Sequence, residues 1–213
     1  KPNSAALGTL VSVDVNSKED LINSVRLILE KYPKVLIEEF LPWNDHRLFV
    51  IDGKMIAAAR RIQPFVLGDG KSTLQELVDK LNETKIEKKL IFDEEFKRYI
   101  KMKRITLGDV IEKDKKVQLR GNANIQTGGF IEDVTDVISE KFIKISEEVA
   151  KELNMRMVGV DLLCEDIKDE NSRYAITEVN GLPSYPYIHD HPDIGEPRET
   201  LSYVLEAIFK DEF

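Results

Sequence analysis

The chain has 213 residues, 42% of them hydrophobic, which suffices to bury an ordinary core in one domain or two closely associated lobes. Its formal net charge of -8 argues against nucleic acid or an anionic membrane as the main partner, because phosphate contacts need clustered Lys and Arg. No stretch approaches the roughly 18 apolar residues of a membrane-spanning helix.

The cysteine content and the first residues bear on location and completeness. Cys164 is the only cysteine, so an internal disulfide is excluded and a reducing cytoplasm fits best. There is no charged segment followed by an apolar one at the N-terminus, as a signal peptide would have. The chain opens on Lys1-Pro2-Asn3 without a methionine, so we expect it to be part of a longer polypeptide. Assembly into a homo-oligomer is left open.

The first sixty residues predict strands around one helix. Residues 9–15 alternate and are rich in β-branched side chains, which favours a strand. Ser17 then offers an N-cap to a helix with apolar residues at helical spacing. Residues 35–40 predict a second strand, and residues 48–51 and 55–59 predict a hairpin that turns at Asp52-Gly53.

The middle of the chain is richer in charge. Thr73 opens a short helix through Leu81, and residues 80–104 mix Lys and Glu, which predicts a largely helical insertion with a solvated surface. Residues 117–120 predict a short strand. The polar loop that follows, residues 121–129, is rich in Asn, Thr and Gly and is a candidate binding element.

The last part predicts an antiparallel pair of strands between two helices. Ser139 caps the first helix, residues 155–164 read as a buried strand, and residues 174–179 return antiparallel to it. Pro197 starts the last helix, which reaches about Phe209. Hairpins dominate and there is no strict βαβ alternation, so the predicted class is α+β.

Three oxygen-bearing side chains suggest a metal site. Asp161 interrupts an apolar run, and burying an unpaired carboxylate costs several kcal/mol, roughly, so it needs a cation nearby. Glu178 and Asn180 are two apart and therefore point to one face of a strand. If the two strands pair, these oxygens converge in a set that suits Mg²⁺. The alternative is that Asp161 pairs with an arginine while Glu178 and Asn180 merely end a strand.

A weaker metal pair is offered by His189 and His191, which are two apart in a proline-rich loop. We expect both to be solvent-exposed instead.

Val158-Gly159-Val160-Asp161 followed by Thr177-Glu178-Val179-Asn180 resembles the paired metal-binding strands of the ATP-grasp superfamily. The resemblance implies ATP and Mg²⁺ as cofactors, with Mn²⁺ as a substitute, and two lobes with mainly antiparallel sheets that sandwich the nucleotide. Residues 1–41 would be part of the small lobe, whose N-terminal portion is missing. Residues 42–213 would be the large lobe with the metal site, including a charged insertion at 71–116.

The resemblance also implies a nucleotide site. Lys1 would be the strand-borne lysine that meets the phosphates, and the small-residue loop of residues 3–8 follows it. The side chain of Glu38 and the main chain of Glu39 and Leu41 would hold adenine. Asp45 would hold the ribose. From alternation alone, only one of Glu38 and Glu39 can line a cleft, and an exposed strand end is the alternative.

Two arginine segments are similar to a pairing in glutathione synthetases, where arginines meet the γ-phosphate and the acyl group. They are Ala59-Arg60-Arg61-Ile62 and Leu119-Arg120-Gly121-Asn122. Alternation lets only one of Arg60 and Arg61 face the site; we choose Arg61 and assign Arg120 and Asn122 to phosphate and acyl contacts. A surface salt bridge is the alternative for either arginine.

Within the superfamily, the motifs most resemble the ATP-grasp part of cyanophycin synthetases and of bifunctional glutathione-forming enzymes. Shared segments include Asp45-His46-Arg47, Gly68-Asp69-Gly70-Lys71 and Asp133-Val134-Thr135-Asp136. The implied function is a ligase that joins a small-molecule carboxylate to an amine through an acyl-phosphate. Two rivals stay open: an ATP-binding module or scaffold without catalysis, and a small-molecule phosphotransferase, which would need a base that the sequence does not reveal.

Overall fold

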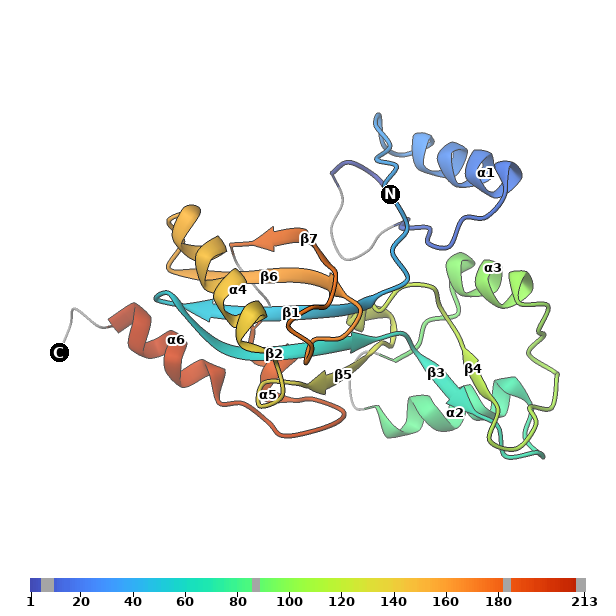
Figure 1. Cartoon of the computed structure of the whole chain (residues 1–213). Helices are drawn as coiled ribbons and strands as arrows, with labels where there is room; N and C mark the ends of the chain where they lie inside the picture. Colours follow the sequence, from blue (N-terminus) through green and yellow to red (C-terminus); the bar gives the residue numbers. More distant parts are fainter. Residues whose placement is uncertain (5–9, 86–88, 182–184, 210–213) are drawn as a thin grey trace. The chain divides into compact units, whose positions relative to one another are not determined.

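The computed structural model describes residues 1–4, 10–85, 89–181 and 185–209 (Figure 1). The chain groups into two compact units. Unit 1 comprises residues 1–40 and 63–129, and unit 2 comprises residues 41–62 and 130–213. These units differ from the predicted lobes, because residues 63–129 group with the first forty residues. The lobes of residues 1–41 and 42–213 stay a prediction.

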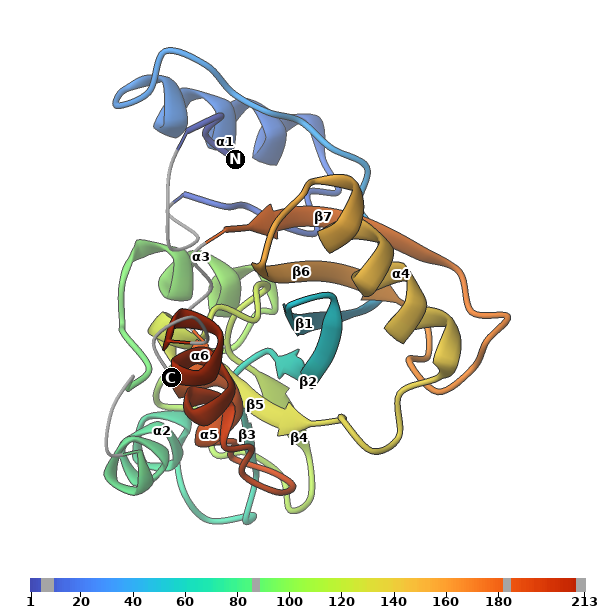
Figure 2. The same cartoon turned by 90° about the vertical axis from the view of Figure 1, so that its left-hand side faces the viewer.

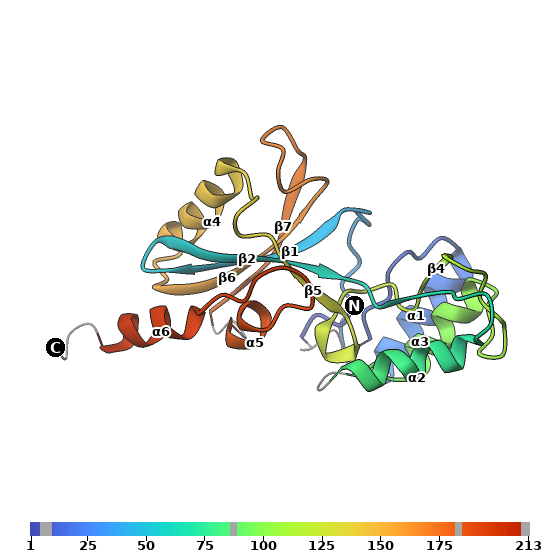
Figure 3. The same cartoon turned by 90° about the horizontal axis from the view of Figure 1, so that it is seen from below.

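Unit 2 is built on a five-stranded antiparallel sheet in the order β5-β2-β1-β6-β7. Its strands are β1 (Asn44–Ile51), β2 (Lys54–Ile62), β5 (Phe130–Asp133), β6 (Met157–Cys164) and β7 (Tyr174–Asn180). Its helices are α4 (Glu140–Glu152), α5 (Tyr185–Asp190) and α6 (Thr200–Phe209). Helix α4 covers one face, whereas α5 and α6 lie on the other (Figure 2, Figure 3).

The sequence of β1 explains why both faces are covered. Leu48 and Val50 point to one face and join the core that includes Phe142 of α4. Phe49 and Ile51 point to the opposite face and pack with Val204 of α6. A strand whose side chains are buried on both faces reads as a continuous apolar run, and Leu48–Ile51 has that pattern.

Unit 1 contains α1 (Lys18–Leu29), α2 (Leu74–Thr84), α3 (Glu94–Met102), the short 3₁₀ helix η1 (Ile125–Thr127), and the two-stranded sheet of β3 (Phe65–Leu67) and β4 (Lys116–Gln118). Its core joins both strands to α2 and α3. Helix α2 begins with the capping box of Thr73 and Glu76, which satisfies two backbone donors at that end.

Most predicted elements are confirmed. The α+β class, the hairpin at Asp52-Gly53, the helices that follow Ser17, Thr73 and Ser139, and the antiparallel return of β7 are all present. The last helix begins at Thr200 rather than Pro197, where Asp190 Oδ1 accepts the Thr200 backbone N–H at 3.0 Å.

Two predicted strands in unit 1 are wrong. Residues 10–15, the described part of the first, form no strand, and Leu10 and Asp14 have left-handed φ values of 54° and 55° that interrupt an extended chain. The second, residues 35–40, retains only an isolated bridge between Val35 and Pro2. Within the described ranges, none of the helices combines the length and apolarity that a membrane crossing requires.

Candidate active site

Strand register in unit 2 gathers polar side chains on one face of the sheet. Arg47 on β1 lies opposite Asp161 on β6, and Asp161 lies opposite Glu178 on β7. Further along, Gly159 lies opposite Asn180. Because paired residues in an antiparallel sheet share a face, these side chains lie on the same side as Phe49, and the predicted convergence of Asp161, Glu178 and Asn180 follows from this register.

Asp161 is almost fully buried, with 4% of its side chain exposed, and it has cationic partners. Arg47 donates from Nε to Oδ1 and from Nη2 to Oδ2, the second at 2.9 Å. Arg61 Nη2 lies 3.2 Å from Asp161 Oδ2. The buried carboxylate is therefore neutralised by two guanidinium groups, so the arginine pairing that the sequence left as an alternative is present.

Arg61 and Asp45 form the neighbouring pair. Arg61 lies opposite Asp45 in the register of β1 and β2, and its Nη2 donates to Asp45 Oδ1 at 2.6 Å. Burial lowers the pKa of Arg61, but the charges of Asp45 and Asp161 outweigh it and leave that pKa raised. The pKa of Asp45 is raised, because burial raises it by more than the charge and hydrogen bond of Arg61 lower it. Arg60 points to the other face and pairs with Glu132 at 2.5 Å, so Arg61 is the arginine on the Asp161 face.

Glu178 and Asn180 complete the group at the outer strand. Glu178 is exposed. In the orientation that satisfies both neighbours, the Asn180 amide nitrogen donates to Glu178 Oε1 at 3.2 Å and its oxygen accepts from Arg47 Nη2 at 3.3 Å. The donor set is two carboxylates and an amide oxygen, which fits a hard divalent cation such as Mg²⁺. No cluster of three or more His, Cys, Asp or Glu side chains with a metal-binding arrangement occurs among the described residues.

In unit 1 the structure brings together two predicted nucleotide residues. Lys1 Nζ lies 2.5 Å from Glu38 Oε2, and Leu36 N donates to Lys1 O at 2.8 Å. Glu39 is exposed. Residues 5–8 of the predicted small-residue loop lie outside the described residues.

Arg120, also in unit 1, is 2% exposed and belongs to the packing of α3. Its Nη2 contacts Asp93 Oδ1 and donates to Ile91 O at 3.0 Å. Asp93 in turn accepts from Phe96 N at 2.9 Å as the N-cap of α3. Asn122 Oδ1 accepts from Asn124 N at 3.4 Å. The roles assigned to Arg120 and Asn122 stay predictions.

The predicted residues thus divide between the units. Unit 2 holds one group that lies together, namely Asp45, Arg61, Asp161, Glu178 and Asn180, and it also holds Leu41. Unit 1 holds Lys1, Glu38, Glu39, Arg120 and Asn122.

Sequence reasoning missed Arg47 and His189. Arg47 stands next to an apolar run, which is the same signal that drew attention to Asp161. His189 was expected to be exposed, and that is wrong: it is 3% exposed and its ring stacks on Phe49 with centroids 5.8 Å apart. Burial, and to a smaller extent the charge of Arg47, lower the pKa of His189 to about 3. His191 is exposed as expected.

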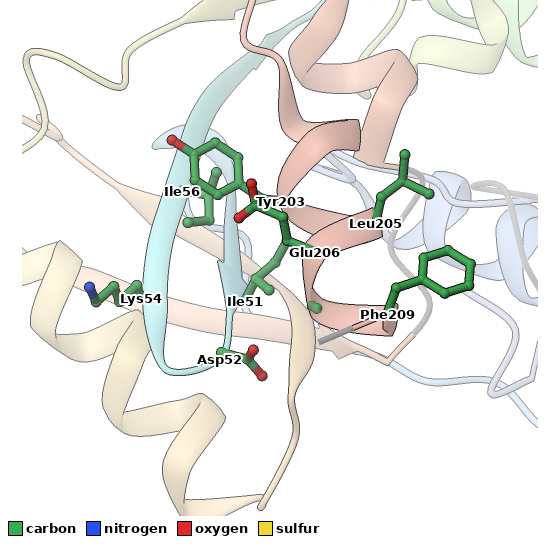
Figure 4. A pocket seen from close by; sticks show the side chains of 9 residues that line it. Ile51, Asp52, Lys54, Ile56, Tyr203, Leu205, Glu206 and Phe209 are labelled. Carbon is green, nitrogen blue, oxygen red and sulfur yellow. The ribbon is translucent and has the colours of Figure 1, made fainter. Parts of the chain in front are cut away.

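A separate hollow of about 720 Å³ lies in unit 2 between the β1–β2 turn and α6. Apolar side chains of β1, β2 and α6 form most of its wall, and the charged residues Asp52, Lys54 and Glu206 form the rest (Figure 4). None of the predicted site residues lines it.

The antiparallel sheet thus carries Asp161, Glu178 and Asn180 on adjacent strands with arginines on the same face, as the resemblance to the ATP-grasp superfamily implied.

Relatives of the chain confirm the predicted resemblance. The chain is 32% identical to a cyanophycin synthetase from Synechocystis over 98% of its length and 25% of that protein. It is 32% identical to a glutathione biosynthesis bifunctional protein from Enterococcus faecalis over 99% of its length and 30% of that protein. The crystal structure of a bifunctional glutathione synthetase from Pasteurella multocida is similar with a TM-score of 0.68 and 26% identity, over 99% of this chain and 30% of that one.

The chain is therefore homologous from end to end to a segment of these synthetases, and it spans between a quarter and a third of their length. No protein-family model matches it.

Proposed function

We propose that the chain is the nucleotide-binding and catalytic part of an ATP-dependent ligase that joins a small-molecule carboxylate to an amine. One observation carries the proposal: Asp161, Glu178 and Asn180 lie on adjacent strands beside Arg47 and Arg61, in a chain that aligns over its whole length with synthetases. ATP and Mg²⁺, or Mn²⁺ in its place, are the proposed cofactors.

Asp161, Glu178 and Asn180 would hold the metal ion through oxygen atoms. When bound, the ion supplies charge neutralisation and alignment of the nucleotide phosphates. Arg61 supplies a fixed positive charge at the same face, because its guanidinium is held by Asp45 and Asp161 at 2.6 and 3.2 Å. We assign it to the γ-phosphate, where negative charge must be stabilised during transfer.

The nucleotide itself would be held by Lys1 at the phosphates, by Glu38 and the main chain of Glu39 and Leu41 at adenine, and by Asp45 at the ribose. The ion pair of Lys1 and Glu38 supports this in part, because it fixes two of these side chains next to one another. Asp45 would have to share its carboxylate between Arg61 and the ribose hydroxyls, and a carboxylate has the lone pairs to do so.

The chemistry then needs no protein nucleophile. An oxygen of the substrate carboxylate attacks the γ-phosphorus, the bond to ADP breaks, and an acyl-phosphate forms. The amine nitrogen next attacks the acyl carbon, phosphate leaves with the bonding electrons, and the nitrogen loses a proton. Arg120 and Asn122 are proposed to stabilise the acyl-phosphate and the tetrahedral oxyanion.

A second candidate is an ATP-binding module without catalysis. The observation that favours it is that one expected metal ligand and one expected catalytic arginine are paired with protein partners. Asp161 is engaged by two arginines, and Arg120 is 2% exposed and engaged by Asp93.

Hydroxylamine trapping separates the two candidates, because hydroxylamine replaces the unknown amine and converts any acyl-phosphate into a hydroxamate. The chain is incubated with ATP, Mg²⁺, hydroxylamine and a panel of amino acids and short acidic peptides. A ligase gives acid-dependent ADP release with an equal amount of hydroxamate, and the Glu178→Gln variant gives neither. Nucleotide binding without ADP or hydroxamate from any acid would favour the module.

A further inference from the structure

Arg47 contacts two of the three proposed metal ligands, Asp161 and Asn180. Its Nε and Nη2 both donate to the Asp161 carboxylate, and Nη2 is also 3.3 Å from the Asn180 oxygen. Arg47 is 8% exposed. It starts on β1 and reaches across β6 to β7, as the strand order requires.

These contacts fix the direction in which Asn180 presents its oxygen. The two ends of an Asn amide are alike in size but opposite in chemistry, since the oxygen accepts hydrogen bonds or binds a cation and the NH₂ group only donates. Arg47 only donates, so it selects the oxygen, and the ionised Glu178 carboxylate only accepts, so it selects the nitrogen. The amide can make both contacts in one orientation only.

The Arg47 guanidinium, with its Nε and Nη2 donors side by side in one plane as a fork, also fixes the Asp161 carboxylate. Two parallel donors from one guanidinium hold a carboxylate in a defined plane more firmly than a single donor does. Arg61 Nη2 adds a third donor at 3.2 Å on Oδ2. The direction of the remaining lone pairs of Asp161 is thereby set by the arginines.

We propose that Arg47 is a positioning residue that orients the Asn180 amide oxygen and the Asp161 carboxylate for a divalent cation. This rests on the proposed function, since it concerns the same metal site. Groups that orient ligands in this way typically change metal affinity by 10- to 100-fold when they are altered.

The test is a double-mutant cycle on Mn²⁺ affinity, measured by electron paramagnetic resonance on the whole 213-residue chain with and without ADP. Arg47→Lys keeps the charge and removes the planar fork. Asn180→Asp offers an oxygen at either end, so its orientation no longer needs Arg47. We expect Arg47→Lys to weaken Mn²⁺ binding by about 10-fold in the wild-type chain and by less than about 3-fold in the Asn180→Asp variant.

Arg60→Lys is the matched control. Arg60 is the adjacent arginine on the opposite face of the sheet and pairs with Glu132, so this change should leave Mn²⁺ affinity within about 2-fold of wild type.

A second measurement covers the case in which Arg47→Lys does not fold. In NMR spectra of the wild-type chain, substoichiometric Mn²⁺ should broaden the Arg47 Nε–H and Asn180 NH₂ signals before the Arg60 Nε–H signal. Equal Mn²⁺ affinity of wild type and Arg47→Lys, or equal losses in both backgrounds, would overturn the positioning role and leave the metal site intact. Broadening of Arg60 before Arg47 would place Mn²⁺ on the opposite face of the sheet and overturn both the proposed metal site and this inference. If the folded wild type binds no Mn²⁺, the proposed metal site fails, and this inference fails with it.

Discussion

Asp161 on β6 lies directly opposite Arg47 on β1, and the Arg47 guanidinium donates to both oxygens of the Asp161 carboxylate. The pair is buried in the middle of the unit 2 sheet, one strand away from the exposed Glu178. Its position makes Asp161 a group on which the stability of the sheet and the proposed metal site both depend.

The first prediction is that Asp161→Asn destabilises the chain. The change leaves the buried guanidinium of Arg47 opposite a neutral amide, and breaking a buried ion pair by removing one partner costs about 3–5 kcal/mol. Urea denaturation followed by circular dichroism measures the loss. Asp136→Asn, at an aspartate whose side chain is 74% exposed, should cost less than about 1 kcal/mol. Equal losses for the two variants would contradict the central place of the Arg47–Asp161 pair.

The second prediction concerns acid. Burial, assisted by the charge of Arg47, lowers the pKa of His189 to about 3. Burial, assisted by the charge of Arg60, lowers the pKa of His46 to about 4. A lowered histidine pKa stabilises the fold above the unfolded value near 6.5, and this stability is lost as pH falls toward the folded values. Each histidine therefore contributes a slope that approaches about 1.4 kcal/mol per pH unit between about pH 6 and pH 4.

His189→Phe keeps a ring against Phe49 and removes one of the two titrating groups. Between about pH 6 and pH 4, His189→Phe should reduce the number of protons taken up on unfolding by about one, and with it the pH slope of the unfolding free energy. His46→Asn should remove the contribution of the second histidine. Denaturant titrations at several pH values measure these slopes. A slope that is unchanged in both variants would show that the two imidazoles are not held neutral in the fold.

The third prediction concerns Arg198, which ties the segment before α6 to the end of β5. Its guanidinium donates to Asp133 Oδ2 at 2.5 Å and to Asp136 Oδ2 at 2.7 Å, and the Asp133 side chain is 8% exposed. Arg198→Met should destabilise the chain by about 3 kcal/mol and speed hydrogen exchange in β5. Arg173→Met, which breaks the exposed pair with Glu165, should cost less than about 1 kcal/mol. A cost for Arg198→Met no larger than that would mean that this tie adds no stability.

The fourth prediction tests the loop of unit 1 that contains Gly128. Gly128 has a φ of 101°, and a Cβ there would lie 2.8 Å from Leu90 Cα, so backbone would have to move. Gly128→Ala should cost about 2 kcal/mol or more in thermal unfolding. Gly108→Ala, at a site where a Cβ meets nothing within 4 Å, should be neutral or slightly stabilising. Similar melting temperatures for both variants would contradict the loop geometry.

The sequence predicted what depends on local pattern. Alternation and the Asp52-Gly53 turn predicted the hairpin. The two-residue spacing of Glu178 and Asn180 predicted that both side chains lie on one face of their strand, and this is the face on which Asp161 of the neighbouring strand lies. It could not predict side-chain pairing between residues far apart in the chain. Arg47 and Asp161 are separated by 114 positions, and only the order of the strands brings them together.

The same limit applies to burial. His189 lies in a polar, proline-rich segment that reads as exposed, and tertiary packing of α5 on Phe49 buries it. The strand expected at residues 9–15 is not formed in its described part for a local reason, because Leu10 and Asp14 adopt left-handed φ values. The β-branched residues around them gave no indication of these values.

The central claim is the metal-dependent nucleotide site, and calorimetric titration of ATP with and without Mg²⁺ tests it most directly. Glu178→Gln is the variant of choice, because Glu178 is exposed and its replacement should leave the fold intact. Glu165→Gln, at an exposed glutamate paired with Arg173, is the control. We predict Mg²⁺-dependent binding of ATP that Glu178→Gln weakens by about 10-fold or more and Glu165→Gln leaves unchanged. ATP binding by the folded chain that is indifferent to both Mg²⁺ and Glu178→Gln, or no binding at all, would contradict the account.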